Sequence, residues 1–283
     1  MIPIAIKASL ILIVLGLGLK ASVSDTLFVF RRPGLLLRAV LAMDVVTPLV
    51  AIALATTLPL DAPVKIALVT MSLAPLPPTF SKKPLKAGGS ISYTVGLFVA
   101  MTLIAILFIP LALTLLTRVF GVPLQMTPGA VWSMVVWSLL APLAAGLVIH
   151  QLAPAFAERI AYGVAKAGTM VLLVAAAPIL ARVWPAMISL IGNGTILAMI
   201  VLAILAMAAG HLLGGPEPEN RVTLALASAG RHPAIALAIA RANFPDEKLA
   251  SAAVLLYLLV CGLATAPYLK WFALPRVTAS TNY

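Results

Sequence analysis

The sequence predicts an all-α integral membrane protein whose chain crosses the bilayer about nine times. A helix needs ~20 residues for each crossing. Hydrophobic residues make up 63% of its 283 residues and charged residues only 10%, a balance far more apolar than that of a soluble domain. The apolar runs are about 18 to 30 residues long, as a spanning helix requires. They lack the alternation of membrane β-strands, so helices are the class that satisfies the backbone in lipid.

The predicted spans follow one another closely, and no linker between them is long enough to separate two domains. Residues 1–283 are therefore expected to form a single transmembrane domain. Residues 1–20 lack a basic start and a cleavage site of small residues, so we interpret them as the first span rather than a removable signal. The expected spans lie at roughly 2–20, 34–58, 62–76, 89–118, 129–150, 158–182, 187–213, 221–244 and 248–272.

The formal net charge of +11 has its simplest explanation in membrane topology. Cytoplasmic loops of membrane proteins collect Lys and Arg, so we expect the lipid bilayer as partner and no nucleic acid. With the N-terminus outside, the inner loops hold more basic residues, Lys20, Arg38 and Lys86 among them, than the outer loops. This asymmetry predicts a multi-pass protein of the cell (inner or plasma) membrane, with the N-terminus outside and the C-terminus in the cytoplasm.

Two places interrupt the helical pattern inside the predicted membrane region. In Ala74-Pro75-Leu76-Pro77-Pro78, each proline lacks a backbone donor and clashes with the preceding turn, which ends a helix. In the second place, Gly230 and Pro233 flank two ionisable residues within an apolar run. Interruptions at corresponding places in two halves point to the binding site of a transporter built from inverted repeats. Ordinary proline kinks are the alternative explanation.

Asp44 is the acidic residue expected in the middle of a span, whereas the others fall in loops or at span ends. A charge at the bilayer centre costs about 2.5–3.5 kcal/mol on insertion scales, so the carboxylate should face the interior and have a partner. The candidate partners are Arg231 and His232 in the second break, or Lys82 and Lys83 after the first. Such a pair would be either a structural lock between helices or part of a proton or cation pathway.

The basic residues of the two breaks have distinct chemistry. The planar fork of Arg231 suits a carboxylate or a sulfate, and His232 titrates near physiological pH when unperturbed. In the alternative interpretation, both side chains only neutralise Asp44. Lys82 and Lys83 either line the pathway or are ordinary cytoplasmic residues at the end of a half-helix.

Signatures of enzymes are absent from the sequence. It contains no phosphate-binding Gly-Lys-Ser loop, no His-Glu-x-x-His helix and no Gly-x-Ser-x-Gly elbow. Its eight acidic residues form no cluster suited to a catalytic metal. Cys261, the single cysteine, offers no disulfide. We therefore expect neither an enzyme nor a bound cofactor.

Several segments, spread from about residue 14 to 272, have an order and spacing known from one transporter family. They are Gly18-Leu19-Lys20, the loop Phe30-Arg31-Arg32-Pro33, the broken segment near Pro75, Gly210-His211-Leu212-Leu213-Gly214, and the run from Arg221 to Ala238. In these segments the chain resembles the bile acid:sodium symporter family. The resemblance implies a core domain of inverted repeats with two discontinuous crossing helices, similar to sodium/proton antiporters, beside a panel domain. Bacterial members commonly have ten spans, so by this resemblance the chain would lack the first and have nine, with the N-terminus outside.

The resemblance also implies where sodium would bind near the first break. Family members place Ser-Asn after that break, where this chain has Phe80-Ser81. Ser81 would keep one hydroxyl, and Thr94 in the next helix would keep another. Thr79 lies in the same broken segment and belongs to the predicted pathway.

In the second crossing, the family's Glu-Val-Gly-Met-Gln-Asn aligns with residues 227–232 of this chain. The carboxylate is replaced by Ala227, Ser228 follows it, and the Gln-Asn pair becomes Arg231 and His232. Because a guanidinium repels a sodium ion, sodium coupling in the family's manner is expected to be lost, and protons remain as a coupling ion.

The features together predict a secondary transporter of a small organic anion, such as a carboxylate or a sulfate. Arg231, His232 and Lys82 would supply positive charge at the crossing, where half-helix N-termini also favour an anion. Asp44 with His232 would couple transport to protons; without that coupling the protein would be a uniporter. The alternatives are a sodium symporter with altered ligands and a non-transporting structural or regulatory membrane protein, with an embedded enzyme the weakest. The substrate, the coupling ion and the oligomeric state stay open.

Overall fold

The computed structural model describes residues 2–272, which contain helices and no β-strand. The predicted all-α class is confirmed, while the C-terminus, for which a cytoplasmic position was predicted, lies outside the described residues. In chain order the elements are α1 (Ile2–Gly18), α2 (Val23–Leu27), α3 (Pro33–Val40), the π-helix η1 (Leu41–Val46), α4 (Thr47–Thr57), α5 (Ala62–Leu73), α6 (Lys82–Lys86), α7 (Ile91–Phe120), α8 (Pro128–Val135), the π-helix η2 (Val136–Leu140), α9 (Ala141–Leu152), α10 (Pro154–Ser189), α11 (Thr195–Leu213), α12 (Pro218–Ala229), α13 (Pro233–Asn243) and α14 (Ala250–Trp271).

Seven helical stretches within residues 2–272 are long and apolar enough to cross a membrane. They are α3–η1–α4, α7, α8–η2–α9, α10, α11, α12–α13 and α14. Two further apolar helices, α1 and α5, are shorter, with 17 and 12 residues. These lengths fit an integral membrane protein, whereas the total of about nine spans stays a prediction.

One predicted span boundary is wrong. The sequence predicted a turn between residues 182 and 187, but α10 continues through Pro178 and Pro185 and ends at Ser189. Prolines are tolerated in membrane helices because neighbouring groups satisfy the carbonyls that they free. The chain turns instead at Asn193 and Gly194, whose positive φ angles of 43° and 80° suit a tight reversal.

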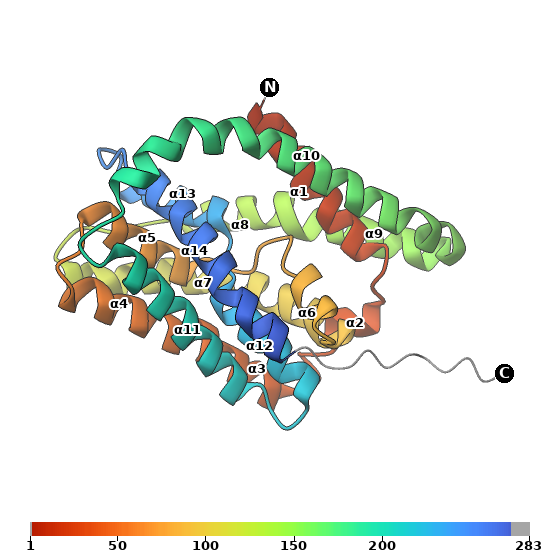
Figure 1. The fold of residues 1–283 in the computed structure, drawn as a ribbon. Helices are drawn as coiled ribbons and strands as arrows, with labels where there is room; N and C mark the ends of the chain where they lie inside the picture. Colours follow the sequence, from red (N-terminus) through yellow and green to blue (C-terminus); the bar gives the residue numbers. More distant parts are fainter. Residues whose placement is uncertain (1, 273–283) are drawn as a thin grey trace.

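The helices form two groups (Figure 1). In the first group, α1 packs along α10 and against α9 at one side of the molecule. The close approach of α1 to α9 requires Gly146, because a Cβ at that position would lie 2.6 Å from the Leu15 carbonyl oxygen. The larger group contains both interrupted helices together with α4, α11 and α14. This grouping is consistent with the core domain and panel domain that the resemblance implies. The inverted-repeat symmetry stays a prediction.

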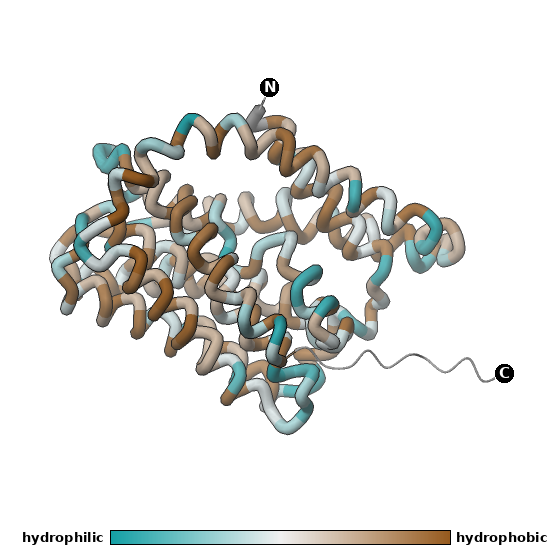
Figure 2. The backbone as a smooth tube through the Cα atoms, in the orientation of Figure 1, coloured by the Kyte–Doolittle hydropathy of each residue, from teal (hydrophilic) through white to brown (hydrophobic). Residues whose placement is uncertain are grey.

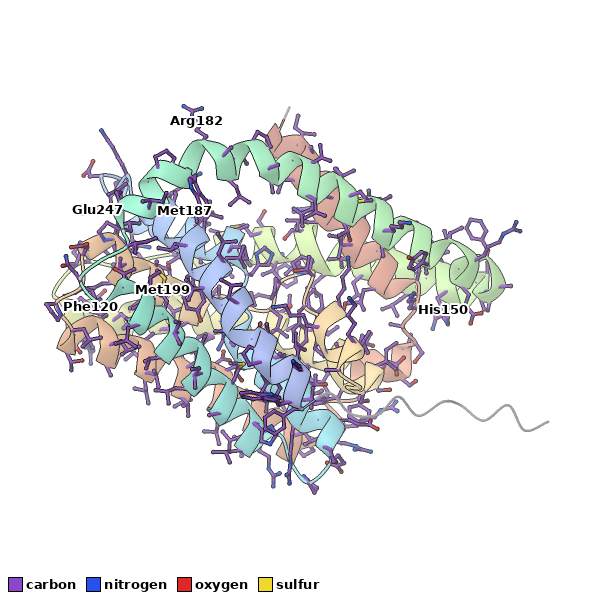
Figure 3. The ribbon with its side chains drawn as sticks, in the orientation of Figure 1. Phe120, His150, Arg182, Met187, Met199 and Glu247 are labelled. Carbon is purple, nitrogen blue, oxygen red and sulfur yellow. The ribbon has the colours of Figure 1, made fainter. Side chains whose placement is uncertain are left out.

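Apolar side chains cover much of the outer surface of the long helices. Figure 2 shows hydrophobic stretches along the helices and hydrophilic residues gathered at the turns. On α10, Trp184 is 52% exposed while Met187 is buried, and Figure 3 shows Arg182 of the same helix pointing away from the molecule. Lipid is the solvent in which such an outer surface is stable.

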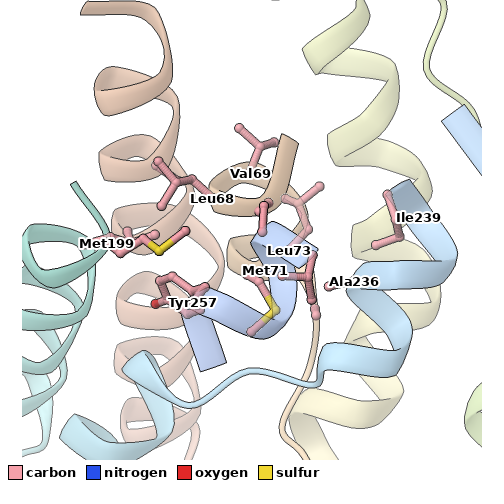
Figure 4. Close-up of a cluster of buried hydrophobic side chains, with 14 of the residues drawn as sticks. Leu68, Val69, Met71, Leu73, Met199, Ala236, Ile239 and Tyr257 are labelled. Carbon is pink, nitrogen blue, oxygen red and sulfur yellow. The ribbon is translucent and has the colours of Figure 1, made fainter. Parts of the chain in front are cut away.

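The main hydrophobic core surrounds the first interrupted helix. Leu68, Met71 and Leu73 of α5 belong to one buried cluster with Met199 of α11 and Tyr257 of α14 (Figure 4). Close-packed interiors hold their side chains in fixed positions. This packing therefore places the end of α5, where the helix breaks, at a defined point inside the fold.

Candidate functional site

The first interruption lies where the sequence predicted it. Helix α5 ends at Leu73, and α6 begins only at Lys82. The cause is local, because Pro75, Pro77 and Pro78 have no backbone N–H to donate to the preceding turn. In a continuous helix the Ala74 carbonyl would accept from residue 78, which is a proline, so this carbonyl is free for another donor.

The second interruption also lies at the predicted place, and it is short. Helix α12 ends at Ala229, Gly230 is extended with φ −84° and ψ 109°, and α13 begins at Pro233. Arg231 and His232 therefore lie on non-helical backbone between two half-helices, which exposes their main-chain groups to partners outside their own segment.

The two interruptions are in direct contact. The backbone N–H of His232 donates to the Pro75 carbonyl over 2.8 Å. Nη1 of Arg231 donates to the Ala74 carbonyl over 3.3 Å. Residues more than 150 positions apart in the chain are thus joined where both helices break.

Arg231 is the centre of this junction, and its side chain is only 2% exposed. Besides Ala74, its guanidinium donates from Nε to the Ser228 carbonyl over 3.0 Å and from Nη2 to the Met43 carbonyl over 2.5 Å. Ala74 and Ser228 lie at the C-terminal ends of α5 and α12, where the negative ends of two helix dipoles favour a cation. The buried charge is therefore compensated by main-chain oxygens from three segments.

The Met43 carbonyl is available because of the residues that follow it. In the π-helix η1 the Thr47 N–H bonds the Ala42 carbonyl, so the next donor in that pattern would be residue 48. Pro48 has no N–H, and Met43 accepts from Arg231 instead. Single π-turns inside α-helices occur frequently at functional sites.

Asp44 lies next to Met43 in the same π-helix, and its Oδ2 atom is buried without a hydrogen-bond partner in the described chain. The hydrogen bonds found for Arg231, Lys82 and Lys83 reach other groups. The ring nitrogens of His232 are likewise buried and without a partner in residues 2–272. The structure thus brings the carboxylate close to the junction without the hydrogen-bonded partner that the sequence led us to expect.

A small cavity of about 130 Å³ lies against the junction. Arg231 and Lys83 line it together with the hydroxyl residues Thr79, Tyr257 and Thr265. Nζ of Lys83 donates to Oγ1 of Thr265 over 2.9 Å, which fixes the ammonium group between α6 and α14. Two cations and three hydroxyl groups around a space of this size suit a small anionic group.

A larger cleft of about 770 Å³ lies between α1, α6 and α10. Its lining includes Lys20, Lys82, Lys86 and Lys166, and no acidic residue. Lys82 donates across the cleft to Thr169 of α10. Of these four lysines, only Lys82 was predicted from the sequence to line the transport pathway. Lys166 had a usable signal, since an ionisable residue inside a predicted span is a functional candidate by default.

The predicted hydroxyl residues are divided between different surroundings. Ser81 lines the larger cleft. Oγ1 of Thr94 donates to the Ser90 carbonyl over 2.7 Å, and Oγ of Ser228 donates to Leu224 over 2.9 Å. Such bonds to the preceding helical turn are common for Ser and Thr. Ser228 therefore contributes its carbonyl to the junction, and Thr94 contributes nothing to it.

Within residues 2–272, no three His, Cys, Asp or Glu side chains gather as ligands for a metal ion. The oxygen atoms that do converge are the main-chain carbonyls around Arg231, with the Asp44 carboxylate beside them. Hard cations prefer oxygen ligands of this kind. In this chain the guanidinium of Arg231 uses them.

Two comparisons with known proteins bear on this geometry. The family described as "Sodium Bile acid symporter family" matches residues 8–181, well over half of the chain. The "Uncharacterized sodium-dependent transporter YocS" of Bacillus subtilis (strain 168) is 26% identical over 140 residues, which are 50% of this chain and 43% of that protein. The match thus spans less than half the length of this relative. The family match includes the first interruption and ends before the second.

Proposed function

We propose that this chain, which belongs to the sodium bile acid symporter family, is a secondary transporter of a small organic anion without the family's usual coupling to sodium. It is a multi-pass membrane protein by its family and its apolar helices. We place it in the cell membrane with the N-terminus outside and the C-terminus in the cytoplasm, on the predicted charge asymmetry of its loops. The lipid bilayer and the anion are its proposed partners; the proposal includes no cofactor and no enzymatic reaction.

The observation that carries the proposal is the position of the Arg231 guanidinium. Unwound carbonyls and half-helix C-terminal ends are the groups with which transporters of broken-helix architecture coordinate sodium. Here the carbonyls of Met43, Ala74 and Ser228 accept from Arg231. The guanidinium of Arg231 is permanently charged and would repel a second cation at this place. Its position therefore supports the proposal that it replaces the sodium ion.

Positive charge near the junction supports an anion as the substrate. Arg231 and Lys83 line the small cavity, and Lys82 lines the larger cleft. Helix α13 begins at Pro233, so the positive end of its dipole points toward the same junction. These charges together favour entry of an anion and disfavour entry of a free cation.

Protons are the coupling ion for which the junction offers groups. Asp44 has a buried oxygen without a partner, and His232 has two ring nitrogens in the same condition within the described chain. Intramembrane acids and histidines that lack fixed partners are typical members of proton relays. If these groups do not titrate during transport, the protein is a uniporter for its anion.

The decisive experiment measures thermal stability of the purified full chain with a panel of organic anions. Each anion is tested with sodium and with choline in its place, at about pH 5.5 and about pH 8, on either side of the usual histidine pKa of ~6.5. A ligand that binds the folded state raises its apparent stability by mass action. We expect stabilisation that depends on the anion and on pH and is the same in choline. Stabilisation by sodium alone would overturn the proposal.

A sodium symporter with altered ligands is the second candidate, and the printed name of the Bacillus subtilis relative, a sodium-dependent transporter, favours it. Sodium would then bind through hydroxyls and carbonyls outside the Arg231 junction, such as those near Ser81 and Thr79. The same experiment separates the two candidates. Under sodium symport, an anion stabilises the protein more strongly in sodium than in choline, because the two ligands bind cooperatively.

A further inference from the structure

The cleft between α1, α6 and α10 contains more positive charge than a monoanion would neutralise. Lys20, Lys82, Lys86 and Lys166 line it without a carboxylate. The remainder of its lining is mainly apolar and includes Ile13, Leu17, Leu85, Ile91 and Met170. A ligand that matches this surface has an apolar body and more than one negative charge.

Lys82 is the central member of this lysine set. It donates to Thr169 of α10, and Lys166 lies three residues earlier on that helix, so the two side chains project from the same face. Lys86 lies four residues after Lys82, and its charge acts on the Lys82 ammonium group. Lys82 is therefore flanked by one cation on its own segment and by another on α10.

Lysines at cytoplasmic loops ordinarily point into water, where the solvent screens them. Lys82 instead reaches across the cleft, and the partner that it finds there is a neutral hydroxyl. Like charges at helical spacing repel each other, and a hydroxyl supplies no compensating charge. A ligand with two negative charges would relieve this repulsion more than a ligand with one.

We infer that the lysine-lined cleft selects organic dianions with an apolar body over monoanions of the same length. The inference rests on the proposed function, since it names the substrate class of that transporter. A dicarboxylate and a phosphate monoester are two sources of the same chemistry, because both present two negative charges near neutral pH. The phosphate concentrates its charges in one group, whereas the dicarboxylate separates them.

Three probes of matched length test the inference: adipate, hexyl phosphate and hexanoate. Their affinities for the purified full chain are measured by calorimetry at about pH 8, where both dianions are fully ionised. We expect at least one dianion to bind about tenfold more tightly than hexanoate, a difference of ~1.4 kcal/mol. Preference for adipate would show that the cleft binds two separated carboxylates. Preference for hexyl phosphate would show that it binds a single doubly charged group.

The double variant Lys82→Gln/Lys166→Gln keeps polar, flexible side chains at both positions and removes two charges. It should reduce the preference for the dianion to about threefold or less, because two of its ion pairs are lost. Lys7→Gln is the matched control, since Lys7 is exposed near the other end of α1 and does not line the cleft. This control should keep the full preference.

The outcomes separate the inference from the proposed function. Hexanoate that binds as tightly as both dianions, or a preference that survives in the double variant, would overturn the inference and leave anion transport standing. Organic anions of other kinds that bind while all three probes fail would also overturn it. If no anion of any charge binds the wild-type chain, the proposed function fails, and the inference fails with it.

Discussion

The backbone N–H of His232 donates to the Pro75 carbonyl over 2.8 Å, so the second interruption is tied to the first through the main chain. This bond does not depend on which side chain is at position 232. The bonds of the neighbouring Arg231 depend on its side chain, since they require three donors of one guanidinium. The junction therefore combines a main-chain contact that positions the breaks with a side chain that supplies charge.

Replacing Arg231 by alanine should weaken the fold measurably. The Met43, Ala74 and Ser228 carbonyls would lose a charged donor while buried, for an expected cost of about 3–5 kcal/mol in the free energy of unfolding. Arg231→Lys should recover part of the loss, because an ammonium group keeps the charge without the planar fork. Denaturant unfolding of the purified variants in detergent measures both values. Wild-type stability in Arg231→Ala would show that these three hydrogen bonds do not stabilise the fold.

Free guanidinium offers a check on the same residue that does not depend on the loss of stability. At low millimolar concentration it should raise the melting temperature of Arg231→Ala and leave that of Arg231→Lys unchanged, because only the alanine variant has both the space and the unpartnered carbonyls. An equal response of both variants would mean that guanidinium binds elsewhere.

The positions of the two interruptions were predictable from the sequence, but the contacts at the junction between them were predictable only in part. Pro75, Pro77, Pro78, Gly230 and Pro233 predicted where helices end, because missing donors and a flexible residue act locally. The partners of Arg231 were not predictable in the same way. They are main-chain carbonyls, which every residue has, and only the three-dimensional packing decides which of them converge.

Other residues of the junction and of the lysine-lined cleft do have signals in the sequence. In an ordinary α-helix Pro48 would remove the donor for the Asp44 carbonyl, so a free carbonyl near this position was predictable from the order of the residues. The π-helix that frees the Met43 carbonyl instead was not predictable in this way. Lys166 lies inside a predicted span, where an ionisable residue is a functional candidate. Thr94 is the opposite case, because its hydroxyl bonds the Ser90 carbonyl. A hydroxyl on a helix commonly has this local partner, so its presence in the sequence says little about a site.

Asp44 is predicted to carry the proton in coupled transport. Its buried Oδ2 atom has no partner within the described chain, so Asp44→Asn should remove a titratable group without breaking a hydrogen bond. We expect uptake driven by a pH gradient in proteoliposomes to be abolished, with the folded yield near that of the wild type. A collapse of the yield would assign Asp44 to a structural lock instead.

The lowered pKa of the Asp25 carboxyl predicts that the stability of the protein depends on pH. Burial alone would raise its pKa, but hydrogen bonds from Ser22 and Ser92 outweigh burial and hold the pKa below its usual value. Oδ2 accepts from the Ser22 backbone N–H over 2.8 Å, and Oδ1 accepts from the Ser92 hydroxyl. The ionised Asp25 carboxylate thus contributes to the stability of the folded state. This contribution is fully present above the unfolded-state pKa of ~3.9 and is lost as the pH falls through the lower folded-state pKa.

Asp25→Asn tests this dependence. At neutral pH the variant should be less stable by about 1 kcal/mol, the typical size of a helix-cap interaction. As the pH is lowered below ~4 the melting temperatures of variant and wild type should converge, because the wild-type carboxyl becomes protonated. A difference that stays constant over the whole range would show that the charge of Asp25 is irrelevant and that the loss of an accepting oxygen atom causes the lower stability.

Ala227 and Arg231 together test whether the guanidinium stands where a mobile cation would bind. Ala227 is fully buried in α12, one turn before the interruption. Ala227→Glu alone should not make the protein sodium-dependent, because the new carboxylate would be neutralised by Arg231 and a further cation would be repelled. In Ala227→Glu/Arg231→Gln, the same carboxylate would lie near carbonyls that have lost their charged donor, which is an oxygen environment suited to sodium. Sodium should then stabilise the double variant and not Ala227→Gln/Arg231→Gln, in which the carboxylate is absent. Sodium stabilisation of Ala227→Glu with Arg231 still present would show that the guanidinium does not exclude a cation from the junction, and the proposed loss of sodium coupling would have to be abandoned.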